Sequence, residues 1–186
     1  MCLDASTETE EAVVNHRILV TWLLWAALAT CGACSSAKDR GAHWVNLVQR
    51  AHHGVDEYRK TDQHSVTEHN NRVADAAERA VRHALSEAPD VPNVTERWVI
   101  QDLYYRLAQL LADTGKTERA ALEIERGLAV DAASTLARAN LLALHGKVLE
   151  QLGNPEAAAK AYHAALLVNE VLMDQALSGG TERGKE

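Results

Sequence analysis

The chain has 186 residues, of which 47% are apolar and 4% aromatic, with no phenylalanine and only three prolines. This length suits one domain plus a leader, and the scarcity of proline beside abundant Ala and Leu favours an all-α fold. The net charge of −7 argues against a basic binding surface, so a nucleic-acid partner is not expected.

An apolar run near the amino terminus, ILVTWLLWAALAT at residues 18–30, is followed by Cys31 and Cys34. It is shorter than the roughly 20 apolar residues of a membrane-spanning helix, and its length suits the hydrophobic part of a secretory signal. Both cysteines follow small residues, in LATC and CGAC, and these segments resemble the lipobox of bacterial lipoproteins. Leu28 and Ala29 match that motif, which favours Cys31 slightly over Cys34.

This resemblance implies that one of the two cysteines carries fatty acyl chains, such as palmitate. The protein would then be anchored in a membrane of the bacterial cell envelope and face the periplasm. Residues 1–30 would form the leader, and residues 31–42 the lipobox cysteines and a flexible tether. The acidic segment before Arg17 does not suit a signal and indicates a start placed too far upstream. An uncleaved membrane anchor, and a secreted or redox-active C-x-x-C protein, are the alternatives.

A pattern of small and aromatic residues marks the carboxy-terminal part of the chain. In GKVLEQLGNPEAAAKAYHAAL, Gly146 is followed by Gly153, Ala158, Tyr162 and Ala165. A glycine at the end of a helix can adopt the left-handed conformation that terminates it, and small residues let two helices pack closely. The pattern resembles the tetratricopeptide repeat (TPR), in which each repeat is a helix–turn–helix unit.

Two further copies precede this one. RLAQLLADTGKTERAALEIERGL has Gly115, Ala120 and Ile124 at the same offsets, and its turn glycine lies 38 residues before that of the last copy. The repeat period of the family is about 34 residues, so the excess is expected to lengthen the start of the intervening helix. The segment 73–89 keeps the residues of a second helix but lacks the turn glycine.

These patterns predict six helices in three antiparallel hairpins, stacked as a short right-handed TPR-like solenoid over residues 43–177. The expected bounds are 43–60, 70–87, 95–113, 117–130, 135–152 and 155–177. Thr95 is the expected N-cap of the third helix. Residues 178–186 are expected to form a disordered tail.

The resemblance also implies a function, because stacked TPR hairpins form a concave groove that binds an extended peptide or a partner helix. The positions that match this partner-binding groove are Asp102, Tyr105, Gln109, Ala112, Asn140, Ala143, Lys147 and Gln151. A non-catalytic protein-binding adaptor or assembly factor, without metal or cofactor, is therefore expected. The alternatives are an ordinary solvated face and, through the apolar last helix, a structural subunit that forms a homodimer.

One histidine cluster offers a catalytic alternative. His64, Glu68 and His69, in HSVTEH, would serve a membrane-tethered, metal-dependent hydrolase if both imidazoles bound zinc from one helix face. The two histidines are five positions apart, or about 500° of helical rotation, so their rings diverge by about 140°. This divergence disfavours a shared zinc ion.

Overall fold

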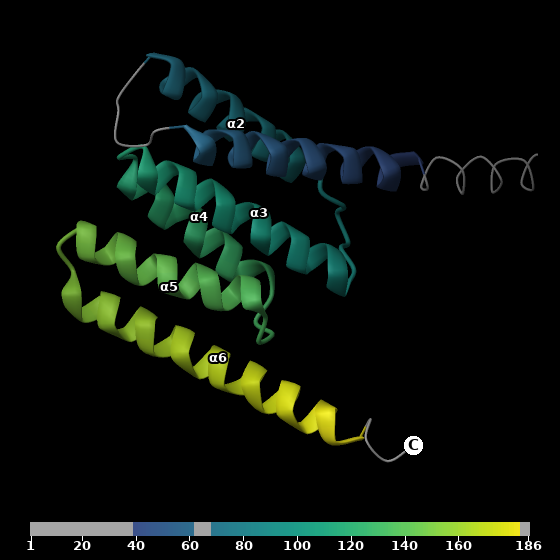
Figure 1. The fold of residues 1–186 in the computed structure, drawn as a ribbon, viewed down its shortest axis with the longest axis vertical. Coiled ribbons are helices and arrows are strands. Elements are labelled where there is room, and N and C mark those ends of the chain that lie inside the picture. The colour runs from purple at the N-terminus through teal and green to yellow at the C-terminus, as the bar shows by residue number, and fades with distance from the viewer. Residues whose placement is uncertain (1–38, 62–67, 183–186) are drawn as a thin grey trace, which may run out of the picture. The chain divides into compact units, whose positions relative to one another are not determined.

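The computed structural model describes residues 39–61 and 68–182. Figure 1 draws the first helix at residues 39–60, followed by α2 (Glu68–Ser86), α3 (Val94–Asp113), α4 (Thr117–Val130), α5 (Leu136–Gln151) and α6 (Pro155–Glu182). No strand occurs among the described residues, so the predicted all-α class is confirmed. The two cysteines of the lipobox-like segments, Cys31 and Cys34, and His64 lie outside the described residues.

The chain divides into two compact units, Met1–His43 and Trp44–Glu186. The helix contacts that position the candidate site all lie within the second unit. Within the described ranges, no helix combines the length and the apolarity needed to cross a bilayer.

The helix bounds differ from the predicted ones by a few residues. Residues 39–42, the first that the structure describes, are helical, whereas the sequence predicted a flexible tether there. The last helix, α6, continues to Glu182, past the predicted end at 177. Near that end the Ser178 hydroxyl donates to the Asp174 carbonyl at 2.8 Å, a hydrogen bond within the helix.

The amino terminus of α3 corrects the predicted cap, because Asn93 and not Thr95 is the N-cap. The Asn93 side chain accepts a hydrogen bond from the Glu96 backbone N–H at 3.0 Å. In return, the Glu96 carboxylate accepts one from the Asn93 backbone N–H at 2.7 Å. This reciprocal capping box satisfies two backbone donors together, which explains why the helix starts at this Asn.

Two glycines end α3 and α5 as the sequence predicted. Gly115 and Gly153 have φ angles of 74° and 77°, in the left-handed region where a Cβ is unfavourable. After each glycine the next backbone N–H donates back to the helix, from Lys116 to Leu111 at 2.8 Å and from Asn154 to Leu149 at 2.9 Å. These hydrogen bonds satisfy carbonyls that a helix end otherwise leaves unpaired.

The helices pack in sequence order. Among the described helices, α3 contacts α2, α4 and α5, and α5 contacts α4 and α6. The first helix packs against α2, since the Trp44 indole N–H donates to the Ala84 carbonyl at 2.9 Å. At its other end, Gly54 lies against Ala77 of α2. From the first contact to the second, the position rises from 44 to 54 in the first helix and falls from 84 to 77 in α2, so the two helices are antiparallel (Figure 1).

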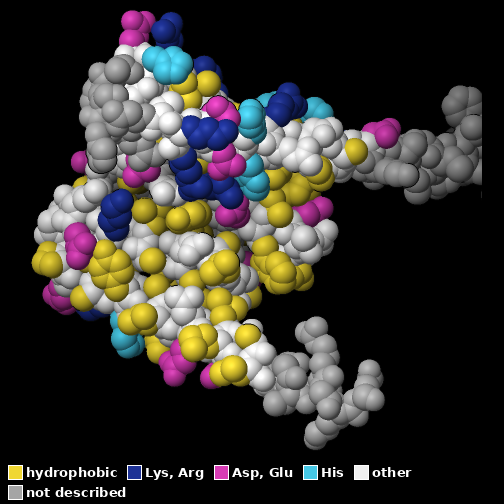
Figure 2. Space-filling model, viewed as in Figure 1, with side chains coloured by type: hydrophobic (Ala, Val, Ile, Leu, Met, Phe, Trp, Pro, Cys, Tyr) yellow, Lys and Arg dark blue, Asp and Glu magenta, His cyan; other side chains and the backbone are white. Residues whose placement is uncertain are grey.

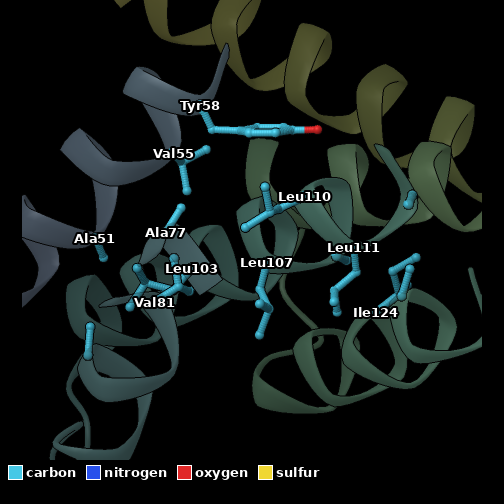
Figure 3. Packing of buried hydrophobic residues seen from close by; sticks show 14 of the residues in the cluster. Ala51, Val55, Tyr58, Ala77, Val81, Leu103, Leu107, Leu110, Leu111 and Ile124 are labelled. Atoms are coloured by element: carbon cyan, nitrogen blue, oxygen red, sulfur yellow. The ribbon is translucent and has the colours of Figure 1, made fainter. Parts of the chain in front are cut away.

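The core is centred on α3, because this helix has neighbours on both sides. Figure 3 shows Leu103, Leu107 and Leu111 of α3 between Val81 of α2 and Ile124 of α4. All five side chains are fully buried. Burial of one such aliphatic side chain contributes about 1.5–3 kcal/mol, so this layer holds the hairpins together.

Candidate partner-binding groove

Helices α3 and α5 run parallel in a fixed register. At one end the Thr135 hydroxyl donates to the Gln101 side-chain carbonyl at 3.1 Å. At the other end Lys147 Nζ lies 4.0 Å from Asp113 Oδ1. In both pairs the two partners are 34 positions apart in the sequence, so the register is constant along the two helices.

A surface depression of about 410 Å³ lies over these two parallel helices. Its lining residues come from α3, α5 and α6 and are Tyr105, Gln109, Asn140, Ala143, Leu144, Lys147 and Tyr162. On α3 and on α5 these residues recur at helical spacing, so each helix presents one continuous face. The structure thus brings together five of the eight residues that the sequence assigned to a groove. The word groove refers below to this depression and its seven lining residues.

The chemistry of the groove suits an extended chain. Gln109 and Asn140 carry side-chain amides that can both donate to and accept from a peptide backbone. Tyr105 offers an aromatic surface with a polar end. Lys147 is 55% exposed, and its one ion pair is as long as 4.0 Å, so its charge is accessible to an acidic group.

One wall of the groove depends on Gly146. A Cβ built at Gly146 would lie 2.5 Å from Cε1 of Tyr162, so the ring occupies the space that a larger residue would need. The Tyr162 hydroxyl donates to Glu150 Oε2 at 2.9 Å and fixes the ring across α5 and α6. Burial and this carboxylate raise the pKa of Tyr162, so the phenol keeps its proton.

Gln109 and Asp113 link the groove to the first helix. Arg59 of that helix donates to the Gln109 side-chain carbonyl. Burial raises the pKa of Asp113 above its ordinary value, although the charges of Lys147 and Arg59 act in the opposite direction. A partner segment that continued past Gln109 would therefore meet a cationic residue of the first helix.

Three predicted groove residues lie elsewhere. Asp102 contacts His52 at 3.1 Å and Arg106 at 2.7 Å, in a charged cluster between α3 and the first helix. Burial raises the pKa of Asp102, but its contacts with these two side chains outweigh burial and lower that pKa below its ordinary value. Ala112 is buried, and Gln151 is exposed at the end of α5, outside the lining of the depression.

The charged cluster is visible on the surface of the molecule. Figure 2 shows Lys or Arg, Asp or Glu and His side chains side by side over the first helix and the adjoining part of α3. Asp56 of the first helix adds to this cluster, 3.5 Å from Arg106. Asp102 thus links the first helix to α3 and does not line the groove.

The residues assigned to helix packing lie between the paired helices. Ala120 and Ala158, at equivalent positions of α4 and α6, are 0% and 1% exposed, and Ala165 is 5% exposed. Tyr162 is only half-buried, because its outer edge also borders the groove. Leu144 lines the groove although the sequence pattern did not select it; its spacing of four from Asn140 was the available signal.

The histidine cluster of the hydrolase alternative is described only in part. Glu68 and His69 are exposed at the start of α2, and His64 lies outside the described residues. Across 39–61 and 68–182, no three His, Cys, Asp or Glu residues form a group that could hold a metal ion.

The chain was also compared with known proteins. No protein-family model, no curated protein and no solved structure matches it.

Proposed function

We propose that this protein is a non-catalytic, TPR-type adaptor or assembly factor that binds a partner protein in its groove. The observation that carries the proposal is the convergence of Tyr105, Gln109, Asn140, Ala143 and Lys147 on one depression. These residues come from two helices, and the repeat pattern of the sequence predicts all five as groove positions.

The arrangement of the helices supports the TPR-like part of the proposal. Two successive pairs, α3 with α4 and α5 with α6, are each joined by a tight turn at a glycine with positive φ. The first helices of the two pairs are parallel, and the second helix of one pair, α4, also contacts α5. These are the contacts expected of a short solenoid in which each hairpin packs on the next.

The bound segment is an extended peptide with at least one acidic side chain. The amides of Gln109 and Asn140 would pair with its backbone, and Tyr105 would pack on an apolar or aromatic side chain. Lys147 would pair with the acidic residue. A groove of this polarity favours moderate affinity, since much of the peptide backbone stays in contact with water.

Selection of peptides from a random display library on the full chain tests this proposal. The selected peptides should share an acidic residue beside an apolar one, and Tyr105→Ala and Lys147→Ala should each weaken binding by about tenfold. Lys160→Ala is the matched control, because this exposed lysine on α6 lies outside the groove. Peptides that bind all three variants as tightly as the unaltered chain would contradict groove binding.

The second part of the proposal is the lipid anchor at Cys31 or Cys34, in the cell envelope of a bacterium. Several acyl chains are needed for stable anchoring, since one chain alone binds a membrane only marginally. Labelled palmitate should be incorporated into the unaltered chain and lost from the double Cys31→Ser, Cys34→Ser variant. Label that persists in the double variant would contradict the anchor, whereas the two single variants identify the acylated cysteine.

Self-association is a second candidate function, and the exposed face of α6 favours it. Leu166, Met173 and Leu177 are 66%, 64% and 70% exposed, and they recur at helical spacing on one side of α6. The outer helix of a solenoid normally presents a polar face, so an apolar one suits a homodimer. Sedimentation analysis of the full chain in non-ionic detergent should then give a dimer, and Met173→Glu should convert it into a monomer.

A further inference from the structure

We propose that the pocket between the first helix and α2 binds a phosphate group. This pocket has a volume of about 310 Å³ and is lined by Leu47, Arg50, Arg79, Ala80 and His83. It lies outside the groove, and the two sites share no lining residue. Phosphate binding can therefore be tested independently of peptide binding.

The register of the two antiparallel helices brings the basic residues of the pocket together. Trp44 contacts Ala84 and Gly54 contacts Ala77, so the middle of the first helix faces the middle of α2. Arg50 consequently lies across from the turn of α2 that carries Arg79. His83 follows Arg79 by four positions and shares its helix face.

These basic side chains have no carboxylate partner among the described residues. Arg79 has no hydrogen bond or ion pair there, and the His83 ring has none either, while Arg50 reaches only the Asn46 carbonyl of its own helix at 3.4 Å. By contrast, most arginines of the helical unit pair with a carboxylate: Arg59, Arg72, Arg82, Arg97, Arg106, Arg119 and Arg126. The chain has 26 acidic residues against 19 Lys and Arg, so arginines without a carboxylate partner are unexpected and favour an anion from outside the chain.

Phosphate fits this set of donors better than a carboxylate does. A guanidinium group binds two oxygens of one anion through parallel N–H groups, and phosphate has further oxygens for a second guanidinium and an imidazole. The two oxygens of a carboxylate lie in one plane, whereas the terminal oxygens of a phosphate point in several directions and can meet donors from both helices. Leu47 and Ala80 form the apolar part of the lining, while Arg50, Arg79 and His83 are exposed, so an anion can reach them directly from solvent.

The phosphate has two chemically equivalent sources: a lipid headgroup or a soluble phosphate compound. Titration calorimetry on the full chain in non-ionic detergent distinguishes them, with inorganic pyrophosphate as one probe and dihexanoyl phosphatidic acid below its micellar concentration as the other. Ionic strength is held constant with chloride. A site for headgroups binds the lipid probe more tightly, and a site for soluble phosphates binds pyrophosphate more tightly.

Matched arginine variants decide whether the pocket is responsible. Arg50→Gln and Arg79→Gln should each weaken binding of the preferred probe by about tenfold, since each removes charge-assisted hydrogen bonds. Arg72→Gln changes an exposed arginine of α2 that lies outside the pocket, so it should leave binding unchanged. All three variants should keep the urea midpoint of the unaltered chain. An equal loss in Arg72→Gln, binding of neither probe, or equal competition by acetate would each overturn the proposal.

Discussion

The α3–α4 and α5–α6 hairpins carry the same pattern of small and apolar residues, but they bury it to different depths. Ile124 of α4 is fully buried, whereas Tyr162, its equivalent in α6, is only half-buried. Leu128 of α4 packs against the core, whereas its equivalent, Leu166, is 66% exposed. Helix α4 is covered by α3 and α5, while among helices α2 to α6 the last helix contacts α5 alone. The place of a hairpin in the stack, and not its motif, therefore sets its burial.

The two hairpins also differ in their charges. Lys116 and Arg119 at the start of α4 pair with Glu78 of α2, and Glu123 of α4 pairs with Arg82. The equivalent positions in α6 are Asn154, Ala157 and Ala161, which cannot form ion pairs. The middle hairpin is thus packed on both sides and paired by charge with α2. The last hairpin is packed on one side, and its ion pair with the middle hairpin is the 4.0 Å contact of Lys147 with Asp113.

The largest expected effect comes from the apolar position that the two hairpins share. Ile124→Ala should lower the free energy of unfolding by about 2–5 kcal/mol, because it leaves a cavity in the closed core. Tyr162→Ala should cost clearly less, since half of the ring already meets solvent. Urea unfolding measures both, and Lys160→Ala, at an exposed site, should stay within about 0.5 kcal/mol. An equal cost at 124 and 162 would contradict the difference in burial.

The charged contact of the middle hairpin predicts a dependence on pH. Burial alone would raise the pKa of Glu78, but the hydrogen bonds from Lys116 and Arg82 lower it from 4.5 to about 2. A carboxylate with a lowered pKa stabilises the fold fully above pH 4.5, and this contribution disappears as the pH falls toward 2. Unfolding free energies between pH 6 and pH 2.5 should therefore fall by on the order of 1–3 kcal/mol from this group.

Glu78→Gln should remove most of that acid-dependent loss, while Glu170→Gln, on exposed α6, should leave it unchanged. The same pH profile in Glu78→Gln as in the unaltered chain would show that this contact does not distinguish the middle hairpin.

A smaller effect is expected at the glycines where paired helices meet. A Cβ at Gly127 would lie 2.8 Å from Tyr104 Cβ, close to the backbone of α3, whereas the atoms nearest to a Cβ at Gly146 belong to the ring of Tyr162. Overpacking lowers the free energy of unfolding by about 1–3 kcal/mol, whereas replacing glycine by alanine inside a helix raises it by up to about 1 kcal/mol.

Gly127→Ala should therefore be net destabilising, and Gly146→Ala less so, because the Tyr162 ring can turn toward solvent. Gly54→Ala, where the nearest atom is 3.4 Å away, is the control and should be neutral or slightly stabilising. Thermal unfolding ranks the three variants, and a larger loss at 146 than at 127 would contradict the comparison.

Much of the helical unit could be predicted from the sequence, because its signals are local. Gly115 and Gly153 mark two helix ends by their conformation alone, and the repeat offset then places Tyr105 and Lys147 on one surface. Asp102 could not be placed in the same way. Its partner His52 is distant in sequence and belongs to the hairpin that lacks a turn glycine, so the register of the two helices was unknown.

For the same reason, the pocket that we propose binds phosphate could not be predicted from the sequence. Arg50 and Arg79 look like ordinary surface arginines in the sequence, and only the antiparallel contact of the first helix with α2 brings them together. Asn93 took the place of Thr95 as N-cap because a reciprocal hydrogen bond to Glu96 favours it, a preference that the sequence could have revealed.

Site-specific photocrosslinking tests the central claim, partner binding in the groove, most directly. A photoreactive residue replaces Gln109 in the groove or Glu118, an exposed residue on α4 outside it. In cells that express the full chain, the probe at 109 should give an adduct of defined mass that disappears when Tyr105→Ala is added. The probe at 118 should give none. Identical adducts from both positions, or an adduct from 118 alone, would contradict a partner-binding groove.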